Sequence, residues 1–191
     1  AVVHLLRRAR QSLAIEQAYI RMDRNREPNP FLAEVLNASR RGVTVRVLLD
    51  SSWFNTAGEM DNDEMAAWIN TLAGKEGLPV EARCHDLSAA GILKIHTKGV
   101  IVDEEESLIS SINWNTNSPT FNREAGVVLA HPEAARYYLA AFDRDWSAAG
   151  QTGRPLTTGD SKGPQLSKAC LAAVVVLAIA GYYYFRRKRG G

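Results

Sequence analysis

The chain is poor in cysteine and histidine, which limits the metal and disulfide sites that it can build. It has two cysteines, Cys84 and Cys170, and four histidines among 191 residues. Neither cysteine has the spacing of a metal site. We expect no disulfide between them, because Cys84 falls in a predicted buried strand and Cys170 at the edge of an apolar segment. His4, His85 and His131 are scattered, and we interpret them as structural or surface residues.

Positive charge is scarce in the first 149 residues. Seven of the 23 Lys and Arg but only one of the 21 Asp and Glu lie in residues 150–191, which leaves 16 basic and 20 acidic residues in residues 1–149. The resulting net charge of −4 argues against the broad basic surface of a nonspecific duplex binder. A local basic cleft is still compatible with it.

The most informative stretch is residues 94–115, which reads KIHTKGVIVDEEESLISSINWN. Its polar residues follow the spacing H-x-K-x4-D and then S-S-x-N: they are His96, Lys98, Asp103, Ser111 and Asn113. The apolar flanks predict two strands, residues 93–102 and 107–114, joined by an acidic turn. Alternate residues of a strand share a face, so the motif's His lies with its Lys, and its Ser with its Asn. If the strands pair as a hairpin, these four side chains meet.

That set of side chains suits a phosphodiester. The imidazole of His96 can attack phosphorus or pass a proton. The lysine, serine and asparagine can hold anionic oxygens as charge builds up in the transition state. Glu124, in NREAGVV, can fix the tautomer of the imidazole and keep it basic. Each residue alone would more often be structural, but the whole spaced set is improbable by chance. Asp103 ends a strand, where turn chemistry explains it, so we assign it a structural role within the motif.

This pattern resembles the phospholipase D superfamily from about residue 1 to residue 149. The resemblance implies an α/β fold with a mixed β-sheet flanked by helices, and a catalytic set of His96, Lys98, Asn113, Ser111, Glu124 and Asp103. It also implies two facing HxK motifs: one histidine forms a phosphohistidine, the other acts as general acid, and no metal or other cofactor takes part. Ser110, a candidate substrate contact, stands where the family usually has glycine, and this weakens the case for full activity.

His96 therefore needs a partner motif, from a missing N-terminal repeat or from a second copy in a homodimer. Glu16, Gln17 and Tyr19 resemble an element that often opens the second repeat of the family. Since the chain also begins with Ala1 rather than Met, we expect a fragment that holds the C-terminal repeat. Glu16 and Gln17 could instead be polar residues at the edge of a sheet.

Periodicity and turn residues predict the element order βαβαβββα in residues 1–149. Asn29 is expected to cap one helix, and Asp61 to start another that ends at Gly74. The loop after the second strand, at the carboxyl end where α/β folds place ligands, offers Trp53 and Asn55 as substrate contacts. A packed surface loop is an equal alternative.

The composition changes after residue 149. Residues 150–167 are rich in Gly, Thr, Ser and Pro and predict a flexible linker. An uncharged run then extends from Ala169 to Phe185 and is followed by the basic sequence RRKR. Residues 168–191 therefore predict a single C-terminal transmembrane helix with a basic tail. The positive-inside bias favours a cytoplasmic C-terminus and an extracytoplasmic catalytic domain.

The sequence thus predicts a membrane-anchored phospholipase D-like phosphodiesterase or phosphatidyltransferase. The tether favours a phospholipid substrate. A membrane-tethered nuclease of the same family is the first alternative, because the motif does not discriminate between diesters. A catalytically silent binding module at the membrane surface is the second.

Overall fold

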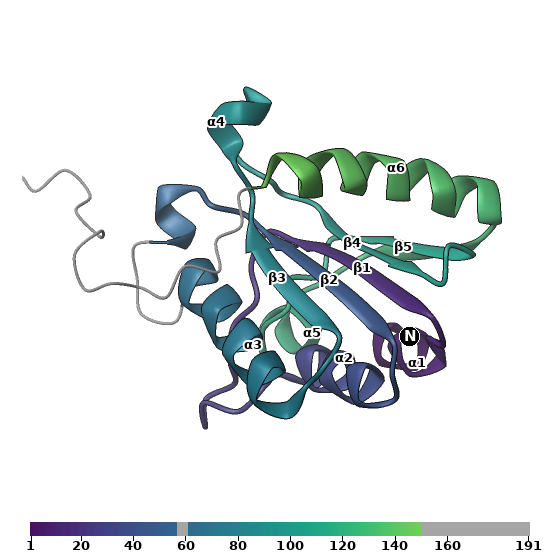
Figure 1. Ribbon diagram of the computed structural model, residues 1–191, viewed down its shortest axis with the longest axis horizontal. Coiled ribbons are helices and arrows are strands. Elements are labelled where there is room, and N and C mark those ends of the chain that lie inside the picture. The colour runs from purple at the N-terminus through teal and green to yellow at the C-terminus, as the bar shows by residue number, and fades with distance from the viewer. Residues whose placement is uncertain (57–60, 150–191) are drawn as a thin grey trace, which may run out of the picture. The chain divides into compact units, whose positions relative to one another are not determined.

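A computed structural model of the protein describes residues 1–56 and 61–149 (Figure 1). The helices of this part are α1 (Val2–Arg8), α2 (Pro30–Arg40), α3 (Asn62–Glu76), α4 (Leu87–Ala90), α5 (Ser118–Phe121) and α6 (Pro132–Ala148). The strands are β1 (Ser12–Gln17), β2 (Thr44–Leu49), β3 (Val80–Cys84), β4 (Lys98–Val102), β5 (Glu106–Ser110) and β6 (Gly126–Ala130). A short 3₁₀ helix covers Trp53–Asn55. Apart from the short helices, the order differs from the predicted βαβαβββα by one strand, because four strands rather than three lie between α3 and α6.

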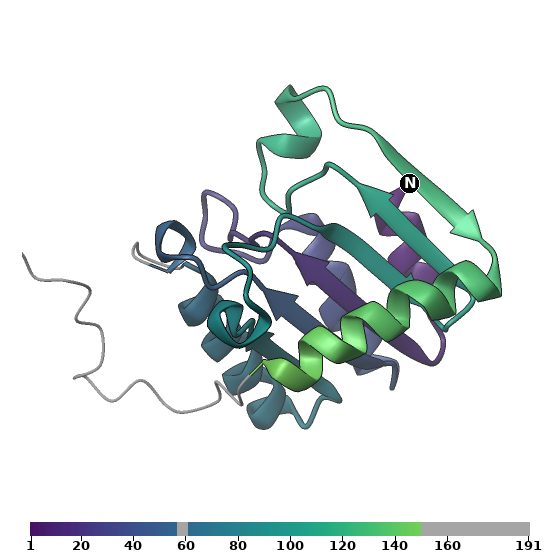
Figure 2. The ribbon, with the colours of Figure 1, turned by 90° about the horizontal axis from the view of Figure 1, so that it is seen from above.

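All six described strands form one mixed sheet with the order β3-β2-β1-β4-β5-β6. The strands β1, β2 and β3 run parallel, whereas β4, β5 and β6 are antiparallel to their neighbours. Parallel neighbours need a crossover, which α2 and α3 supply, and antiparallel neighbours such as β4 and β5 can be joined by a tight turn. The predicted mixed sheet flanked by helices is confirmed, and β1 lies at its centre (Figure 2).

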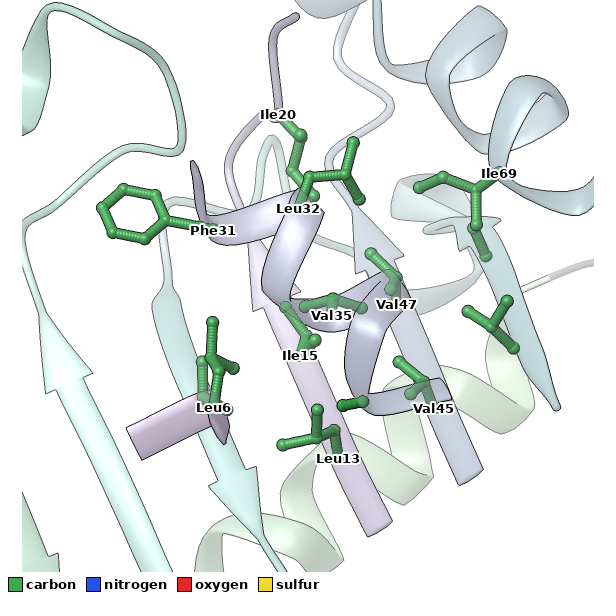
Figure 3. Packing of buried hydrophobic residues seen from close by; sticks show 14 of the residues in the cluster. Leu6, Leu13, Ile15, Ile20, Phe31, Leu32, Val35, Val45, Val47 and Ile69 are labelled. Carbon is green, nitrogen blue, oxygen red and sulfur yellow. The ribbon is translucent and has the colours of Figure 1, made fainter. Parts of the chain in front are cut away.

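Helices cover both faces of this sheet (Figures 1 and 2). The larger core lies under α1, α2 and α3, and Figure 3 shows part of it, with Val35 of α2 over Ile15 of β1 and Val47 of β2. The helix α6 covers the other face with a smaller cluster, whose buried members are Ala14, Leu48, Ile95, Ile101, Ala135, Phe142, Trp146 and Ala149. Odd-numbered residues of β1 therefore face the larger core, and even-numbered ones face α6.

One of the predicted helix caps is confirmed and one helix end is corrected. The side-chain oxygen of Asn29 accepts hydrogen bonds from two backbone N–H groups of the first turn of α2, at 2.9 and 3.1 Å. The helix α3 continues through Gly74 and ends before Gly77, which has a φ of 66°. Glycine adopts this left-handed conformation without steric cost, so Gly77 ends the helix instead of Gly74.

The two strands predicted around the motif are shorter than expected. The strand β4 starts only at Lys98, because its partner β1 ends opposite it at Gln17. The strand β5 ends at Ser110, so Ser111 and Asn113 follow it in a loop. The expectation that His96 lies within a strand is therefore wrong, and other contacts must hold the three loop residues.

The predicted linker (150–167) and the predicted transmembrane helix and tail (168–191) lie outside the described residues. Among the helices of residues 1–56 and 61–149, none combines the length and the apolar composition that crossing a bilayer requires.

Candidate active site

The predicted catalytic residues gather where β4 begins and β5 ends. The two strands pair antiparallel, with Gly99 opposite Ile109. Ser110 tightens this end of the hairpin by donating a hydrogen bond from Oγ to the backbone oxygen of Lys98 at 3.1 Å. The predicted hairpin is thus confirmed, and it brings the H-x-K segment next to the S-S-x-N segment.

His96 lies in the loop just before β4, and its side chain is exposed. Its backbone oxygen accepts a hydrogen bond from Nζ of Lys98 at 2.7 Å. The ammonium group therefore lies against the backbone that carries the imidazole. An exposed imidazole with a cation beside it is accessible to an anionic ligand.

A buried carboxylate that we did not single out from the sequence holds the loop before His96. Asp50 follows β2 and is 0% exposed. Its Oδ1 accepts a hydrogen bond from the backbone N–H of Ile95 at 2.6 Å. Its Oδ2 accepts hydrogen bonds from Nδ2 of Asn55 at 2.8 Å and from the backbone N–H and the hydroxyl of Ser52. The available signal was its place directly after a parallel strand, where ligand sites gather.

Lys98 and Gln17 lie opposite each other on β4 and β1. Directly paired residues of neighbouring strands project to the same face, so both side chains point to the same side. Lys98 is 4% exposed and Gln17 is 0% exposed. Neither amide atom of Gln17 has a hydrogen-bond partner among the described residues. The interpretation of Gln17 as a residue at the edge of the sheet is therefore wrong, because it lies in a strand paired on both sides and is buried with an amide that lacks a partner.

Glu124 ties the loop after β5 to the segment before β6. Its Oε2 accepts a hydrogen bond from Oγ of Ser111 at 2.5 Å, and its Oε1 accepts from the hydroxyl of Ser118 and from Nδ2 of Asn122 at 3.1 Å. These bonds, that from Ser111 above all, hold the pKa of Glu124 below its ordinary value. The carboxylate is thus ionised and engaged with its own loop. The described hydrogen bonds of Glu124 come from residues of its own loop and none comes from His96. The prediction that Glu124 fixes the imidazole of His96 in the same chain is corrected accordingly.

Asn113 is fixed by the same network but keeps a buried side-chain atom unpaired. Its backbone N–H donates to Oγ of Ser118 at 3.1 Å. Its Oδ1 is buried and lacks a hydrogen-bond partner in the described part of the chain. Since the oxygen and nitrogen of an amide can exchange places by a flip, Asn113 can turn either atom to this position.

The charges around His96 favour its neutral form. The ammonium of Lys98 is the main cause of an imidazole pKa below the ordinary value, and partial burial and Lys94 add to the effect. The pKa of Lys98 is lowered too, mainly by burial and then by Lys94, while Glu124 and Asp50 oppose the shift. A neutral imidazole among cations suits attack on a phosphate or acceptance of a proton.

Asp103 lies at the other end of β4 and takes no part in this cluster. Its carboxylate accepts hydrogen bonds from the backbone N–H groups of Arg10, Gln11 and Ser12 at 3.0, 2.8 and 2.9 Å. Its own φ is 53°, a left-handed conformation that Asp tolerates better than most residues. This placement agrees with a structural role and separates Asp103 from the catalytic set implied by the resemblance.

The three candidate substrate contacts have different surroundings. Trp53 is 77% exposed and lines a hollow of about 690 Å³ beside the site. Asn55 is corrected, because it is buried and donates its amide hydrogens to Asp50 and to the backbone oxygen of Ala18. Ser110 is half-buried and bonded within the hairpin, as described above. Of the three, Trp53 has a side chain open to a ligand.

Other titratable groups lie under α6, away from the cluster. Burial first, and then Asp145, raises the pKa of Glu16 to about 7. The side chain of His85 is fully buried, with Nε2 3.5 Å from Oδ1 of Asp145. Among residues 1–56 and 61–149, no three His, Cys, Asp or Glu side chains are grouped so that they could hold a metal ion.

The family model described as "Cardiolipin synthase, PLD-like domain" matches residues 2–146. The chain belongs to this phospholipase D-like family. The match includes all six strands of the described sheet and every residue of the candidate site.

Curated relatives share this domain but are longer. The mitochondrial cardiolipin hydrolase of Canis lupus familiaris is 30% identical over 132 residues, which make up 67% of this chain and 46% of that protein. The protein of the same name from Mus musculus is 30% identical over 107 residues, or 56% of this chain and 42% of the relative. The chain thus spans less than half the length of these relatives.

Solved structures have the same fold, and one of them, Nuc, is described as a phospholipase D family member. Nuc from Salmonella typhimurium has a TM-score of 0.61 at 21% identity, covering 78% of this chain and 86% of Nuc. NucT from Helicobacter pylori has a TM-score of 0.59 at 15% identity, covering 78% of this chain and 87% of NucT. Phosphatidylserine synthase from Haemophilus influenzae has a TM-score of 0.62 at 17% identity, covering 82% of this chain and 38% of that enzyme. At these identities the likeness concerns the fold alone.

Proposed function

We propose that this phospholipase D-like domain is a phosphodiesterase or phosphatidyltransferase that acts through a phosphohistidine. The carrying observation is that the buried amide of Gln17, with both atoms unpaired, and the buried unpaired Oδ1 of Asn113 lie at the same end of the sheet as Lys98 and the exposed His96. Unpaired buried amides are costly unless a ligand completes them. Phosphate oxygens supply acceptors for amide and ammonium donors.

Each residue has a chemical role in this proposal. A neutral imidazole attacks phosphorus, a P–N bond forms, and the bond from phosphorus to the leaving oxygen breaks as that oxygen takes a proton from a general acid. Water or an alcohol then gives its proton to the second histidine and attacks phosphorus, so a new P–O bond forms as the P–N bond breaks, which frees the first histidine. Lys98 and Asn113 hold the anionic oxygens, and Ser111 and Glu124 fix the loop that carries Asn113.

One HxK motif provides one of the two histidines, and the second comes from a second copy or from a preceding repeat. If a preceding repeat supplies the partner, His96 is proposed as the acid and base; in a homodimer, the His96 residues of the two copies divide the roles of nucleophile and acid–base. Phospholipid is the favoured substrate, supported by the name of the curated relatives, cardiolipin hydrolase, and by the uncharged run of residues 169–185. That run is proposed as a single-pass anchor, with the basic tail in the cytoplasm and the domain on the other side.

The test compares full-length wild-type protein with His96→Asn on labelled phospholipid vesicles and on labelled single-stranded DNA. We expect lipid hydrolysis by the wild type and a loss of about 10³-fold in His96→Asn, as for removal of a catalytic acid–base group. The unfolding transition should be unchanged, because the side chain is exposed. His4→Asn, at an exposed position on α1, is the matched control and should keep full activity.

Other results would lead to different conclusions. Cleavage of DNA without lipid hydrolysis would replace the lipid enzyme with a nuclease. Turnover of neither substrate would point to a silent binding module. EDTA should leave the rate unchanged, because Lys98 balances the phosphate charge, and inhibition would contradict this mechanism. If the protein without residues 168–191 still sediments with membranes, the proposed anchor is wrong.

A further inference from the structure

Four large apolar side chains protrude from two loops next to the active site. The short helix after β2 exposes 77% of Trp53 and 49% of Phe54, and the loop after α4 exposes 42% of Ile92 and 94% of Leu93. Single exposed apolar residues are common, but several together mark an interaction surface. We call these four residues the loop patch.

The loop patch borders the hollow of about 690 Å³, which Trp53, Phe54 and Leu93 help to line. Leu93 is three residues before His96 in the same loop, so the patch and the imidazole belong to one continuous segment. Lys94, between them, places Nζ 5.7 Å from the ring centroid of Phe54. The patch therefore combines aromatic and aliphatic side chains with a cation.

The path of the chain indicates what this surface faces. Ala149, just after α6, belongs to the small cluster under that helix, and Leu87 of α4, which also lines the hollow, packs against the same cluster. Figures 1 and 2 both show the C-terminal end of α6 beside α4. The chain thus leaves the described domain next to the loop patch. The 19 residues between this point and the proposed anchor at residues 169–185 would span roughly 20–25 Å as a random chain.

We propose that the loop patch inserts into the head-group region of a phospholipid bilayer and turns the His96 end of the sheet towards the lipid. The inference rests on the proposed membrane anchor and deepens the proposed function. Tryptophan is favoured at the membrane interface, and the lysine can reach phosphates while its stem stays among apolar groups. Protruding loop tips suit a soft surface. A second copy would instead find two exposed apolar side chains on one face of the sheet, Ile109 of β5 and its partner Val127 of β6, which are 36% and 47% exposed.

Brominated lipids test the proposal directly, because they quench tryptophan only where it enters the bilayer. The full chain is reconstituted into phosphatidylcholine–phosphatidylglycerol vesicles with brominated or ordinary acyl chains. Bromination should quench part of the wild-type emission, and Trp53→Phe should remove most of that quenching. The control adds Tyr137→Trp to Trp53→Phe. Tyr137 is 73% exposed on α6, about 18 Å along the helix from Ala149, so the new tryptophan should stay unquenched.

Equal quenching of wild type and Trp53→Phe overturns the proposal, and so does the absence of quenching, whether or not the chain associates with the vesicles. A second copy on the patch would instead give unquenched emission and a doubled mass by light scattering, and Leu93→Ser would abolish the dimer. The fluorescence result does not depend on turnover, so it can fail or succeed separately from the proposed enzymatic activity.

A kinetic readout links the patch to lipid turnover. Leu93→Ser should lower the ratio of hydrolysis of vesicle lipid to hydrolysis of a soluble aryl phosphodiester by roughly tenfold or more, as expected for loss of one buried leucine. Tyr137→Ser should leave this ratio unchanged. An unchanged ratio in Leu93→Ser would show that the patch does not serve the reaction at the bilayer.

Discussion

The two ends of β4 are built in opposite ways, although each carries a charged residue of the same motif. At one end the carboxylate of Asp103 accepts three backbone hydrogen bonds, and the turn is saturated. At the other end Lys98 is buried beside Gln17, whose amide lacks partners in the described structure. Polar groups that are fully hydrogen-bonded within the protein stabilise the fold, whereas buried polar groups without partners are candidates for binding a ligand. The spacing of a motif alone does not make this distinction.

The largest effect expected from the comparison of the two ends of β4 is on stability, at the end where Asp103 is fully hydrogen-bonded. Asp103→Ala should lower the free energy of unfolding by about 3 kcal/mol, because three charge-assisted hydrogen bonds are lost and alanine disfavours a positive φ. Denaturant unfolding measures this loss. The folded fraction should keep its kcat on the phosphodiester. Glu104→Ala is the control, an exposed neighbour in the same turn with a φ of 59°. Equal losses in the two variants would show that the hydrogen bonds of Asp103 contribute nothing.

Asp50→Asn probes the active end, where a buried carboxylate positions the loop of His96. The amide of asparagine keeps the shape of the aspartate side chain but lacks its negative charge, which weakens the hydrogen bond from the backbone N–H of Ile95. The loop of His96 then holds the imidazole less well, so kcat should fall about 30-fold. The carboxylate of Asp50 opposes the lowering of the His96 pKa. Its removal should therefore lower that pKa further and move the acid limb of the pH–rate profile to lower pH. A loss of stability without a shift of the profile would reduce Asp50 to a structural residue.

Gln17→Leu should separate function from stability in the same strand. The substitution removes a buried amide without partners, so the protein should become about 1 kcal/mol more stable. The same change removes a ligand for phosphate, and kcat/KM should fall about tenfold. Gln11→Leu, at an exposed position just before the same strand, should change neither quantity much. A Gln17→Leu protein with full activity would contradict the role of this amide at the site.

The sequence predicts most of the sheet because its strands alternate with clear helices and turns. The cap at Asn29 and the hairpin of β4 and β5 follow from local chemistry, and both are confirmed. The start of β4 does not follow, because it depends on where β1 ends, and strand pairing is a tertiary property. The role of Asp50 could not be predicted from the sequence for the same reason, since its hydrogen bond with Ile95 joins residues that are 45 positions apart. Glu124 and Ser111 were found as site residues, but the hydrogen bond between them was not, nor were the other partners of Glu124, Ser118 and Asn122.

The smallest effect distinguishes the two chemical roles of His96. Lys94 lowers the pKa of this imidazole, so Lys94→Met should raise it slightly, because a single nearby charge that is partly screened by solvent is removed. If the neutral imidazole attacks phosphorus, the higher pKa means that less His96 is neutral at low pH in Lys94→Met than in the wild type. The acid limb of kcat/KM then moves to higher pH. If His96 instead donates a proton, the protonated form persists longer, and the basic limb moves to higher pH. Lys75→Met, in the last turn of α3, is the charge-matched control and should move neither limb. An unshifted profile in Lys94→Met would mean that the ionisation limiting the rate belongs to another group.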